Sequence, residues 1–576
     1  MRTKGGRLFS LVLSAVLYVS CVPAWGSGMT ESPPTVDTPP AIALSSPTPF
    51  LPEGSLPLPT PTPVASPIPP PASPTPLVSN APLRLWVEAA VPPTLRAAVS
   101  ATGLPLAASE ADATLRYGLY TPQVSIPDTW TVWVYALVAP FPTVEDGVSA
   151  ADLRRAWAEE PTGLFGGRPL LMDESTLAAF SAHWGPPAAD AVRVVQSAHL
   201  LDEAWAARPS WAIIPFEDLE PRWKVLTIDG QSPIRRGFNP ATYPLTLTFA
   251  LQASPGVSVS FSPPLTNLDP SKMTTLVMTG VTALVRATAY RMERYGSLYP
   301  AADIRDDLRS ADITHISNEV PFAENCPYPD PASTFLIFCS NPDYIALLED
   351  VGADVIELTG NHFQDYGSEA TLMTLDMYAA RGWSYFGGGR DLADSQQPAL
   401  LEHNGNRFAF IGCNPVGPAF AWATDTRPGA APCGDYGWMT AAISQLRADG
   451  YQVIVTMQYW EYYVAAPPSN QERDFARLAQ AGAVIVSGSQ SHFPQAFAFE
   501  GDSFVHYGLG NLFFDQMDTP VAGTRREFVD RHVFYNGRHI STEVLTYMLE
   551  DYARPRPMTP AERADLLQEI FLASGW

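Results

Sequence analysis

Short apolar runs alternate with amphipathic stretches throughout the C-terminal half of the chain. The runs predicted as strands lie at residues 274–278, 313–316, 355–358, 408–411, 453–457 and 483–486. Residues 341–350 and 368–380 carry apolar side chains at helical spacing. Strands that alternate with helices in this way indicate an open α/β sheet.

A second region with the same alternation lies between residues 82 and 256. Its predicted strands are residues 83–87, 113–117, 130–138, 212–214 and 223–228, and its predicted helices are residues 95–102, 150–159, 174–184 and 199–207. The pattern predicts a second open α/β unit. We call residues 82–256 the middle domain and residues 270–576 the C-terminal domain.

The first residues are typical of an export signal. Arg2, Lys4 and Arg7 precede an apolar stretch at residues 8–19. This stretch is shorter than a helix that spans a bilayer. Cys21 follows a small residue, as the acylated cysteine of a lipoprotein does. We predict a signal peptide at residues 1–27, with either lipidation of Cys21 and a membrane lipid anchor, or ordinary cleavage between residues 24 and 27.

Residues 28–81 are rich in Pro, Ser and Thr. Such a composition cannot bury a core, and it favours extended polyproline II structure. We therefore predict a linker that holds the folded domains away from a membrane or wall layer.

The chain of 576 residues is long enough for two or three domains. It has 59 acidic and 35 basic residues, which gives a net charge of −24. This charge repels nucleic acid and anionic lipid headgroups, so no nucleic-acid partner is expected. It also opposes simple electrostatic capture of a polyanion.

The cysteines other than Cys21 are typical of an oxidising compartment. Cys326 and Cys339 bracket one loop, and Cys413 and Cys433 bracket another. Four cysteines allow three pairings, and the two local disulfides are favoured because each closes a loop without helical or strand periodicity. The spacing is not that of a thiolate metal site.

Four segments that follow predicted strands carry a family resemblance. They read ISNEVPF at residues 316–322, LTGNHFQDYG at 358–367, SGSQSHFPQ at 487–495 and YGLGNLFFDQ at 507–516. In order and spacing they resemble the poly-γ-glutamate capsule-synthesis (CapA) family of metallophosphoesterase-like proteins. The resemblance implies a metallophosphoesterase-like α/β sandwich and a role in capsule or exopolymer biosynthesis or export.

The resemblance also implies site residues. Asn318 and Glu319 match one family element, Asn361 and His362 match the Gly-Asn-His element, and His492 matches the second histidine of the terminal pair. Three positions depart from the family pattern. Where relatives place probable metal ligands, this chain has Val281, Gln458 and Gln490. Valine cannot bind a metal, and glutamine is a weak ligand.

Two interpretations of this site remain open. In the first, Glu319, His362 and His492 are catalytic residues that hold a divalent metal, Zn or Mn, whose bound water supplies hydroxide. In the second, the site is a metal-free pocket that binds carboxylates, amides or sugars through neutral donors and acceptors. The residues predicted for this pocket are Asn318, Asn361, Gln458, Glu461 and Gln490.

Glu461 lies within the aromatic run at residues 459–463, and we expect it in an aromatic cleft. His506, His532 and His539 stand outside the family elements and are expected to be structural.

The middle domain resembles a type-2 periplasmic solute-binding domain. The resemblance rests on residues 132–157, 170–185 and 208–233, and it implies an open α/β fold. Ser175, Thr176 and Arg193 are its candidate ligand-binding residues by position.

The sequence thus predicts an exported protein of capsule or exopolymer (poly-γ-glutamate) biosynthesis or export, with a metallophosphoesterase-like site that has lost ligands. One alternative is a non-catalytic surface module that binds a polymer or cell-wall fragment, and another is an active metal-dependent hydrolase. The expected partners are an anionic or wall polymer, or membrane proteins of capsule synthesis.

Overall fold

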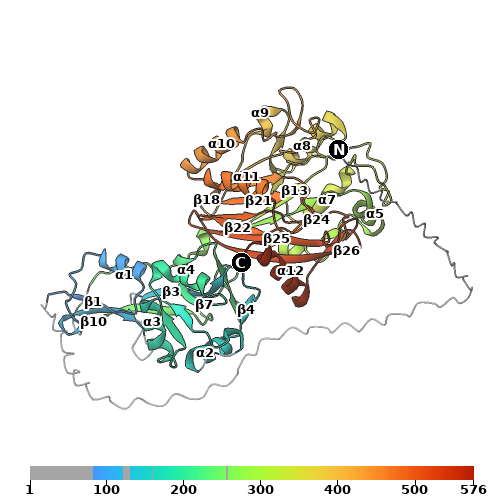
Figure 1. Cartoon of the computed structure of the whole chain (residues 1–576). Helices are drawn as coiled ribbons and strands as arrows, with labels where there is room; N and C mark the ends of the chain where they lie inside the picture. Colours follow the sequence, from blue (N-terminus) through green and yellow to red (C-terminus); the bar gives the residue numbers. More distant parts are fainter. Residues whose placement is uncertain (1–81, 121–129, 160, 162, 255–256, 258) are drawn as a thin grey trace, which may run out of the picture. The chain divides into compact units, whose positions relative to one another are not determined.

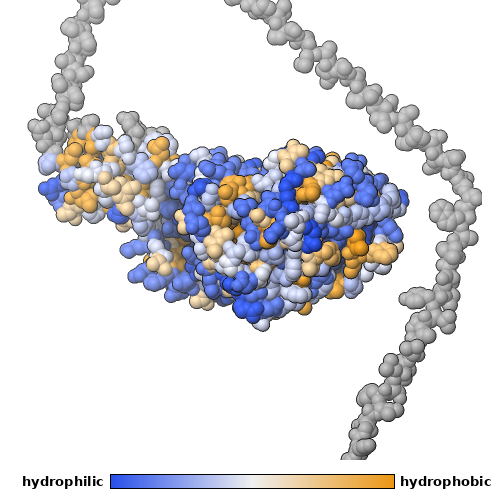
Figure 2. Space-filling view, turned by 90° about the horizontal axis from the view of Figure 1, so that it is seen from above, coloured by the Kyte–Doolittle hydropathy of each residue, from blue (hydrophilic) through white to orange (hydrophobic). Residues whose placement is uncertain are grey.

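The computed structural model describes residues 82–120, 130–159, 161, 163–254, 257 and 259–576. The predicted signal peptide, Cys21 and the Pro-rich linker lie outside these residues. Within the described part of the chain, no helix is both long enough and apolar enough to cross a bilayer. Figure 2 shows a face on which separate hydrophobic patches are surrounded by hydrophilic residues.

The middle domain contains an eight-stranded mixed sheet with the order β1-β2-β10-β3-β7-β5-β6, in which β8 also pairs with β3 (Figure 1). Its strands are β1 (Leu85–Val87), β2 (Leu115–Leu119), β3 (Trp130–Pro140), β5 (Leu170–Met172), β6 (Val192–Val194), β7 (Trp211–Pro215), β8 (Trp223–Val225) and β10 (Thr246–Ala253). A separate two-stranded ladder joins β4 (Gly147–Val148) to β9 (Thr227–Ile228). The helices are α1 (Pro93–Ser100), α2 (Ala150–Ala158), α3 (Glu174–Trp184) and α4 (Leu200–Ala206).

The predicted elements of the middle domain are present, but strands β5, β6 and β10 of its sheet are not among them. Strand β10 lies between β2 and β3 and is antiparallel to both. Its partners are far away in the sequence, so local periodicity does not reveal its place in the sheet. The prediction of an α/β fold is confirmed, whereas the exact domain boundaries stay a prediction.

The C-terminal domain contains two large sheets (Figure 1). The nine-stranded sheet has the order β15-β14-β13-β11-β25-β26-β27, and β12 and β24 extend it beside β13. The six-stranded sheet has the order β17-β18-β20-β21-β23-β22. The strands of the first sheet are β11 (Met273–Thr279), β12 (Val281–Thr282), β13 (Ile313–Asn318), β14 (Val355–Glu357), β15 (Ser384–Phe386), β24 (Asn511–Phe513), β25 (Arg526–Tyr535), β26 (Arg538–Glu550) and β27 (Arg554–Pro557). Those of the second are β17 (Ala399–His403), β18 (Asn406–Cys413), β20 (Gln452–Gln458), β21 (Ile485–Ser489), β22 (Phe497–Glu500) and β23 (Ser503–His506).

The two sheets pack against each other and are covered by helices on their outer faces. Phe410 of β18 and Ile454 of β20 share a buried core with Leu276 of β11. Their neighbours Ile411 and Val455 point to the opposite face, because side chains alternate along a strand. Helices α5 (Arg286–Tyr295), α7 (Ile345–Asp350) and α8 (Gly367–Ala380) cover the first sheet, and α10 (Gly437–Ala448) and α11 (Ser469–Gln480) cover the second. The result is the four-layer α/β sandwich that the resemblance implies. Helix α12 (Pro560–Ala573) adds side chains to the core between the sheets.

The hairpin of β25 and β26 is absent from the predicted strands. Residues Val529–Tyr535 of β25 pair with the whole length of β11, so β25 joins the centre of the first sheet. Glu527, Asp530 and His532 are buried in this strand. Buried polar side chains interrupt the apolar run by which a core strand is recognised, so the sequence pattern conceals it.

Both predicted disulfides are present. Cys326 is bonded to Cys339, with Cα atoms 5.7 Å apart, and Cys413 is bonded to Cys433, with Cα atoms 5.0 Å apart. Each bond closes a loop near the carboxyl end of a strand, which limits the movement of that loop.

Candidate functional site

The site lies where strands of both sheets end. Glu319 directly follows β13, and Asn361 and His362 lie in the loop after β14. Gln458 is the last residue of β20, and Gln490 directly follows β21. Parallel strands present their carboxyl ends at one edge of a sheet, where the connecting loops diverge. The predicted site residues therefore come from both halves of the sandwich.

Gln458 connects the two sheets through its side-chain amide. Its Nε2 donates to Glu319 Oε1 at 2.8 Å and to Asn361 Oδ1 at 3.0 Å. Its Oε1 lies 3.4 Å from Asn414 Nδ2. Gln458 and Glu319 are only 2% and 3% exposed. A carboxylate buried to this extent needs a donor, and the amide supplies one.

The carboxylate of Asp365 forms a hydrogen bond with the ring of His362. Its Nδ1 lies 2.6 Å from Asp365 Oδ2, and the same oxygen accepts from the backbone N–H of Phe338 at 2.8 Å. Burial alone would lower the pKa of His362. The hydrogen bond to Asp365 and the negative charges of Glu319 and Glu461 outweigh this effect and raise the pKa. His362 thus lies within electrostatic reach of both glutamates.

His492 is oriented by an amide. Its Nδ1 lies 2.8 Å from Asn511 Oδ1, while Asn511 Nδ2 donates to the carbonyl of Thr524 at 3.1 Å. The amide oxygen therefore faces the ring, so Nδ1 carries the proton. Gln490 and His492 both adopt left-handed backbone, with φ of 78° and 50°. Such conformations cost about 1–3 kcal/mol each in residues other than glycine, and they gather at functional sites.

A pocket of about 240 Å³ opens beside this network, and we call it the C-terminal pocket. Its lining residues are Asn361, Asn414, Val416, Gln458, Tyr459, Trp460, Glu461, Tyr462 and Gln490. Glu461 accepts hydrogen bonds from Gln490 Nε2 at 3.2 Å and from Tyr463 Oη at 3.0 Å. Trp460 is 47% exposed. The pocket therefore combines amides, one carboxylate and an accessible aromatic ring.

Asn318 does not line this pocket. Its Nδ2 donates to Tyr378 Oη at 2.7 Å and to the carbonyl of Val320 at 2.8 Å. The side chain is fully buried against α8. It points into the core because Asn318 and Glu319 are adjacent, and neighbouring residues at a strand end face opposite sides.

Val281, at a departure from the family pattern, is a buried residue of the short strand β12. It pairs with Ser317 of β13 and with Asn511 of β24. Its side chain is 1% exposed and contributes no polar atom to the site.

Two residues near the site were missed by the sequence analysis. Asn414 follows β18 directly and donates to the carbonyl of Thr359 at 2.8 Å. The sequence could have indicated Asn414, because this residue follows a predicted strand, as the other site residues do. The second is Arg286, whose positive φ of 43° is invisible in the sequence.

Arg286 lies between the two aromatic rings that contact the site histidines. Its guanidinium is 4.9 Å from the Phe338 ring and 5.1 Å from the Phe514 ring. The Phe338 ring centroid is 4.6 Å from that of His362, and the Phe514 centroid is 5.0 Å from that of His492. These contacts fix the positions of both imidazoles relative to each other.

Residues 275–516 match the family of the bacterial capsule synthesis protein PGA_cap. The matched residues lie within the C-terminal domain. The chain is 25% identical over 291 residues to the capsule biosynthesis protein CapA of Bacillus anthracis, a match that covers 50% of this chain and 70% of that protein. It is 28% identical over 201 residues to the PGA biosynthesis protein CapA of Bacillus subtilis, a match that covers 34% of this chain and 52% of that protein.

Solved structures resemble parts of the chain more distantly. A putative 5′-nucleotidase from Staphylococcus aureus has 12% identity and a TM-score of 0.32, and the match covers 51% of this chain and 58% of that one. An ABC-type phosphate transport receptor from Vibrio cholerae has 13% identity and a TM-score of 0.23, over 26% of this chain and 71% of that one. At these scores the likeness carries no argument about either site.

The donor set of the C-terminal domain does not fit the expected Zn or Mn ion. In the described residues, no group of three or more His, Cys, Asp or Glu side chains is arranged to hold a metal. Gln458 directs an N–H donor at Glu319 and Asn361, and such a donor cannot be a ligand. His362 and His492 each use Nδ1 in a hydrogen bond, as metal-ligating histidines do. Glu319, the third predicted metal ligand, accepts a hydrogen bond from the Gln458 amide. Metal binding stays a prediction.

The three remaining histidines of interest are buried between the two sheets. His506 Nδ1 lies 2.6 Å from Asp530, and His532 Nδ1 lies 2.9 Å from Thr542 Oγ1. Burial lowers the pKa of His539 to about 3. An imidazole that stays neutral in the core fits the structural role expected for these residues.

The three candidate ligand-binding residues of the middle domain have different environments. Thr176 lines a pocket. The Ser175 hydroxyl donates to Asp173 at 3.0 Å, and Arg193 pairs with Glu203 at 2.5 Å on the surface. Thr176 alone of the three therefore faces a cavity that a ligand can enter.

Proposed function

We propose that this chain is an exported accessory protein of capsule or exopolymer synthesis, whose CapA-family domain binds a polymer without cleaving it. The family match supports the role, because the Bacillus relatives are named for capsule and PGA biosynthesis. The two disulfides fit an oxidising, extracytoplasmic compartment. The predicted linker and lipid anchor would hold the domain near the synthesis machinery of the membrane.

The observation that carries the proposal is the hydrogen bond from Gln458 to Glu319. It fills the place of a metal ligand with a neutral donor, so the residues of the site are suited to recognition rather than to activation of water. The amides of the C-terminal pocket can donate to and accept from the amide or hydroxyl groups of a polymer. The exposed ring of Trp460 provides an apolar surface for stacking.

The charge of the protein limits which part of the polymer is recognised. Glu319 and Glu461 place negative charge at the pocket, and the whole chain has a net charge of −24. Both repel the free carboxylates of a polymer such as poly-γ-glutamate. The pocket therefore binds the amide backbone of such a chain, or a neutral wall fragment, while the carboxylates stay in solvent.

The test is binding and turnover measured on the same purified full-length protein. Poly-γ-glutamate oligomers and peptidoglycan fragments are added separately, and thermal unfolding and reaction products are followed. We expect one of these polymers to raise the unfolding temperature without product. Asn361→Ala should remove this shift, because it removes an amide of the pocket, and the exposed amide variant Gln397→Ala should keep it.

Two outcomes would contradict the proposal. One is release of product from either polymer that Glu319→Gln abolishes. The other is a stoichiometric Zn or Mn ion in protein purified without chelator and lost in the His362→Ala, His492→Ala double variant, which would favour the metal-dependent hydrolase.

A further inference from the structure

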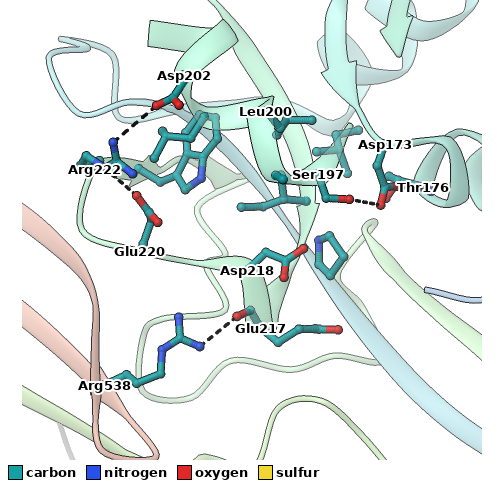
Figure 3. Close-up of a pocket in the computed structure, with 16 residues that line it drawn as sticks. Asp173, Thr176, Ser197, Leu200, Asp202, Glu217, Asp218, Glu220, Arg222 and Arg538 are labelled. Carbon is teal, nitrogen blue, oxygen red and sulfur yellow. Dashed lines mark hydrogen bonds and ion pairs between the residues drawn. The ribbon is translucent and has the colours of Figure 1, made fainter. Parts of the chain in front are cut away.

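One pocket of the middle domain is lined by polar and charged side chains, and we call it the middle-domain pocket (Figure 3). Its volume is about 450 Å³, which is in the range of small-molecule sites. It lies at the amino end of α3, beside α4 and the 3₁₀ turn Phe216–Asp218 that follows β7. Arg538 of β26 reaches its rim.

Carboxylates outnumber basic groups in this pocket. The lining includes five acidic residues, Asp173, Asp202, Glu217, Asp218 and Glu220, and two basic residues, Arg222 and Arg538. Figure 3 shows Arg222 between Asp202 and Glu220, with contacts of 3.5 Å and 2.7 Å. These two acids are neutralised by one arginine.

The other three acids lack an ion-pair partner in the described structure. Arg538 donates to the backbone carbonyls of Glu217 at 3.3 Å and Leu219 at 2.9 Å rather than to a carboxylate. Asp173 accepts from the backbone N–H of Thr176 at 2.7 Å and from Ser197 at 3.1 Å, and so caps α3. These neutral donors orient the Asp173 carboxylate without cancelling its charge.

Buried oxygen atoms in and under the pocket also lack partners among the described residues. Thr176 lines the pocket and is fully buried, yet its Oγ1 has no hydrogen bond. Glu217 Oε1 is likewise buried and unpartnered, whereas Glu217 Oε2 accepts a hydrogen bond from Asn267 Nδ2 at 2.6 Å. Below them the hydroxyl of Tyr135, also fully buried, has no acceptor. Unsatisfied polar atoms are costly, and a bound ligand that supplies donors removes the cost.

The protonation of the acids reflects this excess of negative charge. Burial raises the pKa of Glu217 to about 7, and the neighbouring charge of Asp218 contributes. Burial and the charge of Asp173 raise the pKa of Asp218 to about 6, although Arg538 opposes the shift. Burial and the same three carboxylates raise the pKa of Tyr135.

The charges and hydrogen-bond acceptors that line the middle-domain pocket determine which class of ligand it can bind. An anion such as phosphate would be repelled by three carboxylates without ion-pair partners. A bare metal ion does not fit either, since no described group of three acidic or histidine side chains is arranged as a metal site. An alkylammonium group carries three N–H donors and a positive charge, and it matches oxygens that accept but have no donor.

We infer that the middle-domain pocket binds a small organic cation through a primary ammonium group, which Glu217, Asp218 and the Thr176 hydroxyl accept. The inference is independent of the polymer-binding role of the C-terminal domain. It also predicts that binding strengthens as the pH rises through about 6 to 7, because the two acids must lose their protons to hold the cation.

The test uses 1,4-diaminobutane as the probe and calorimetric titration of the full-length protein at constant ionic strength. We expect saturable binding at pH 8 that is at least about tenfold weaker at pH 5.5. Asp218→Asn and Glu217→Gln should each weaken binding by about tenfold or more. Glu203→Gln is the matched control, because this carboxylate of α4 pairs with Arg193 outside the pocket.

Several results would overturn the inference. They are the absence of diamine binding by the folded protein at pH 8, undiminished binding by both pocket variants, saturable binding of inorganic phosphate that either variant changes, or displacement of the diamine by micromolar Mg²⁺ or Ca²⁺. Circular dichroism of each variant separates a lost site from a lost fold.

Discussion

The C-terminal pocket and the middle-domain pocket differ in the donors that they supply to their carboxylates. In the first, Glu319 receives a hydrogen bond from Gln458 and Glu461 receives one from Gln490. In the second, Glu217 keeps one buried oxygen without a donor, and Asp218 has no hydrogen-bond or ion-pair partner among the described residues. The same fold class therefore supplies donors to both carboxylates in one pocket and leaves carboxylate oxygens without donors in the other, although Gln490 Oε1 of the first pocket is itself unpartnered among the described residues.

This difference determines which hydrogen bonds and which charge a ligand must supply in each pocket. Where the protein supplies the donors, the empty site is stable, and a ligand is recognised by added hydrogen bonds and stacking. Where donors are lacking, the empty site is destabilised, and a cation relieves it. Three substitutions test this contrast.

The largest effect is expected from Gln458→Leu. The substitution leaves Glu319 buried without its amide donor, so we expect a loss of about 2–4 kcal/mol in the free energy of unfolding. Urea denaturation followed by circular dichroism measures it. Gln445→Leu, an exposed amide of α10, should change stability by less than about 0.5 kcal/mol. If the two variants are equally stable, the Gln458 amide does not stabilise the buried Glu319 carboxylate.

A smaller effect of opposite sign is expected from Glu217→Gln. The folded-state pKa of Glu217 is raised to about 7, so the native state retains a proton that the unfolded chain releases at lower pH. Stability therefore falls as the pH rises from about 4.5 through 7. The neutral amide has no such penalty, and we expect it to stabilise the ligand-free protein by about 1–3 kcal/mol at pH 8.

This gain should disappear toward pH 4, where the carboxyl is protonated in both states. Denaturation midpoints at the two pH values measure it. Glu220→Gln is the control, because Glu220 is already paired with Arg222 at 2.7 Å. If Glu217→Gln destabilises the protein at pH 8, the Glu217 carboxylate does not destabilise the ligand-free pocket, and the proposed difference between the two pockets is wrong.

The smallest effect is expected from Trp460→Ala. The ring is 47% exposed, so its removal should change the free energy of unfolding by less than about 0.5 kcal/mol. Polymer binding should weaken by about 1–2 kcal/mol, because the stacking surface is lost. Calorimetric titration measures it, with Tyr328→Ala, an exposed ring outside the pocket, as the control. Equal weakening in both variants would show that the pocket is not the binding surface.

Much of the fold could be predicted because its parallel strands are continuous apolar runs. Strands β13, β18 and β20 are recognised in this way, and residues 174–184 were predicted as the helix that the structure shows as α3. Strand β25 is not, because Glu527, Asp530 and His532 are buried within it. Strand β10 is central only through pairing with partners distant in sequence. Such pairing depends on long-range contacts that a local pattern does not contain.

The candidate site was predictable to a similar extent. Glu319, Asn361 and Gln458 follow strands that the pattern identifies, and the structure joins them by hydrogen bonds. Asn318 was assigned to the pocket by its match to a family element, yet its side chain faces the core. Asn414 was overlooked, although it bonds to the same amide. Side-chain direction at the end of a strand depends on how the strand meets its neighbours, and one sequence does not state it.

The sequence by itself determined the α/β class, the two disulfides and the resemblance of the C-terminal domain to the CapA family, because each depends on local composition, spacing or ordered motifs. It also named the positions at which that resemblance predicts replaced metal ligands. Only the tertiary structure decided that Gln458 donates to Glu319, that Asn318 is buried, and that Glu217 and Asp218 face one cavity with Arg538 at its rim. The reason is physical: hydrogen-bond direction and unbalanced charge depend on distances between residues that are far apart along the chain.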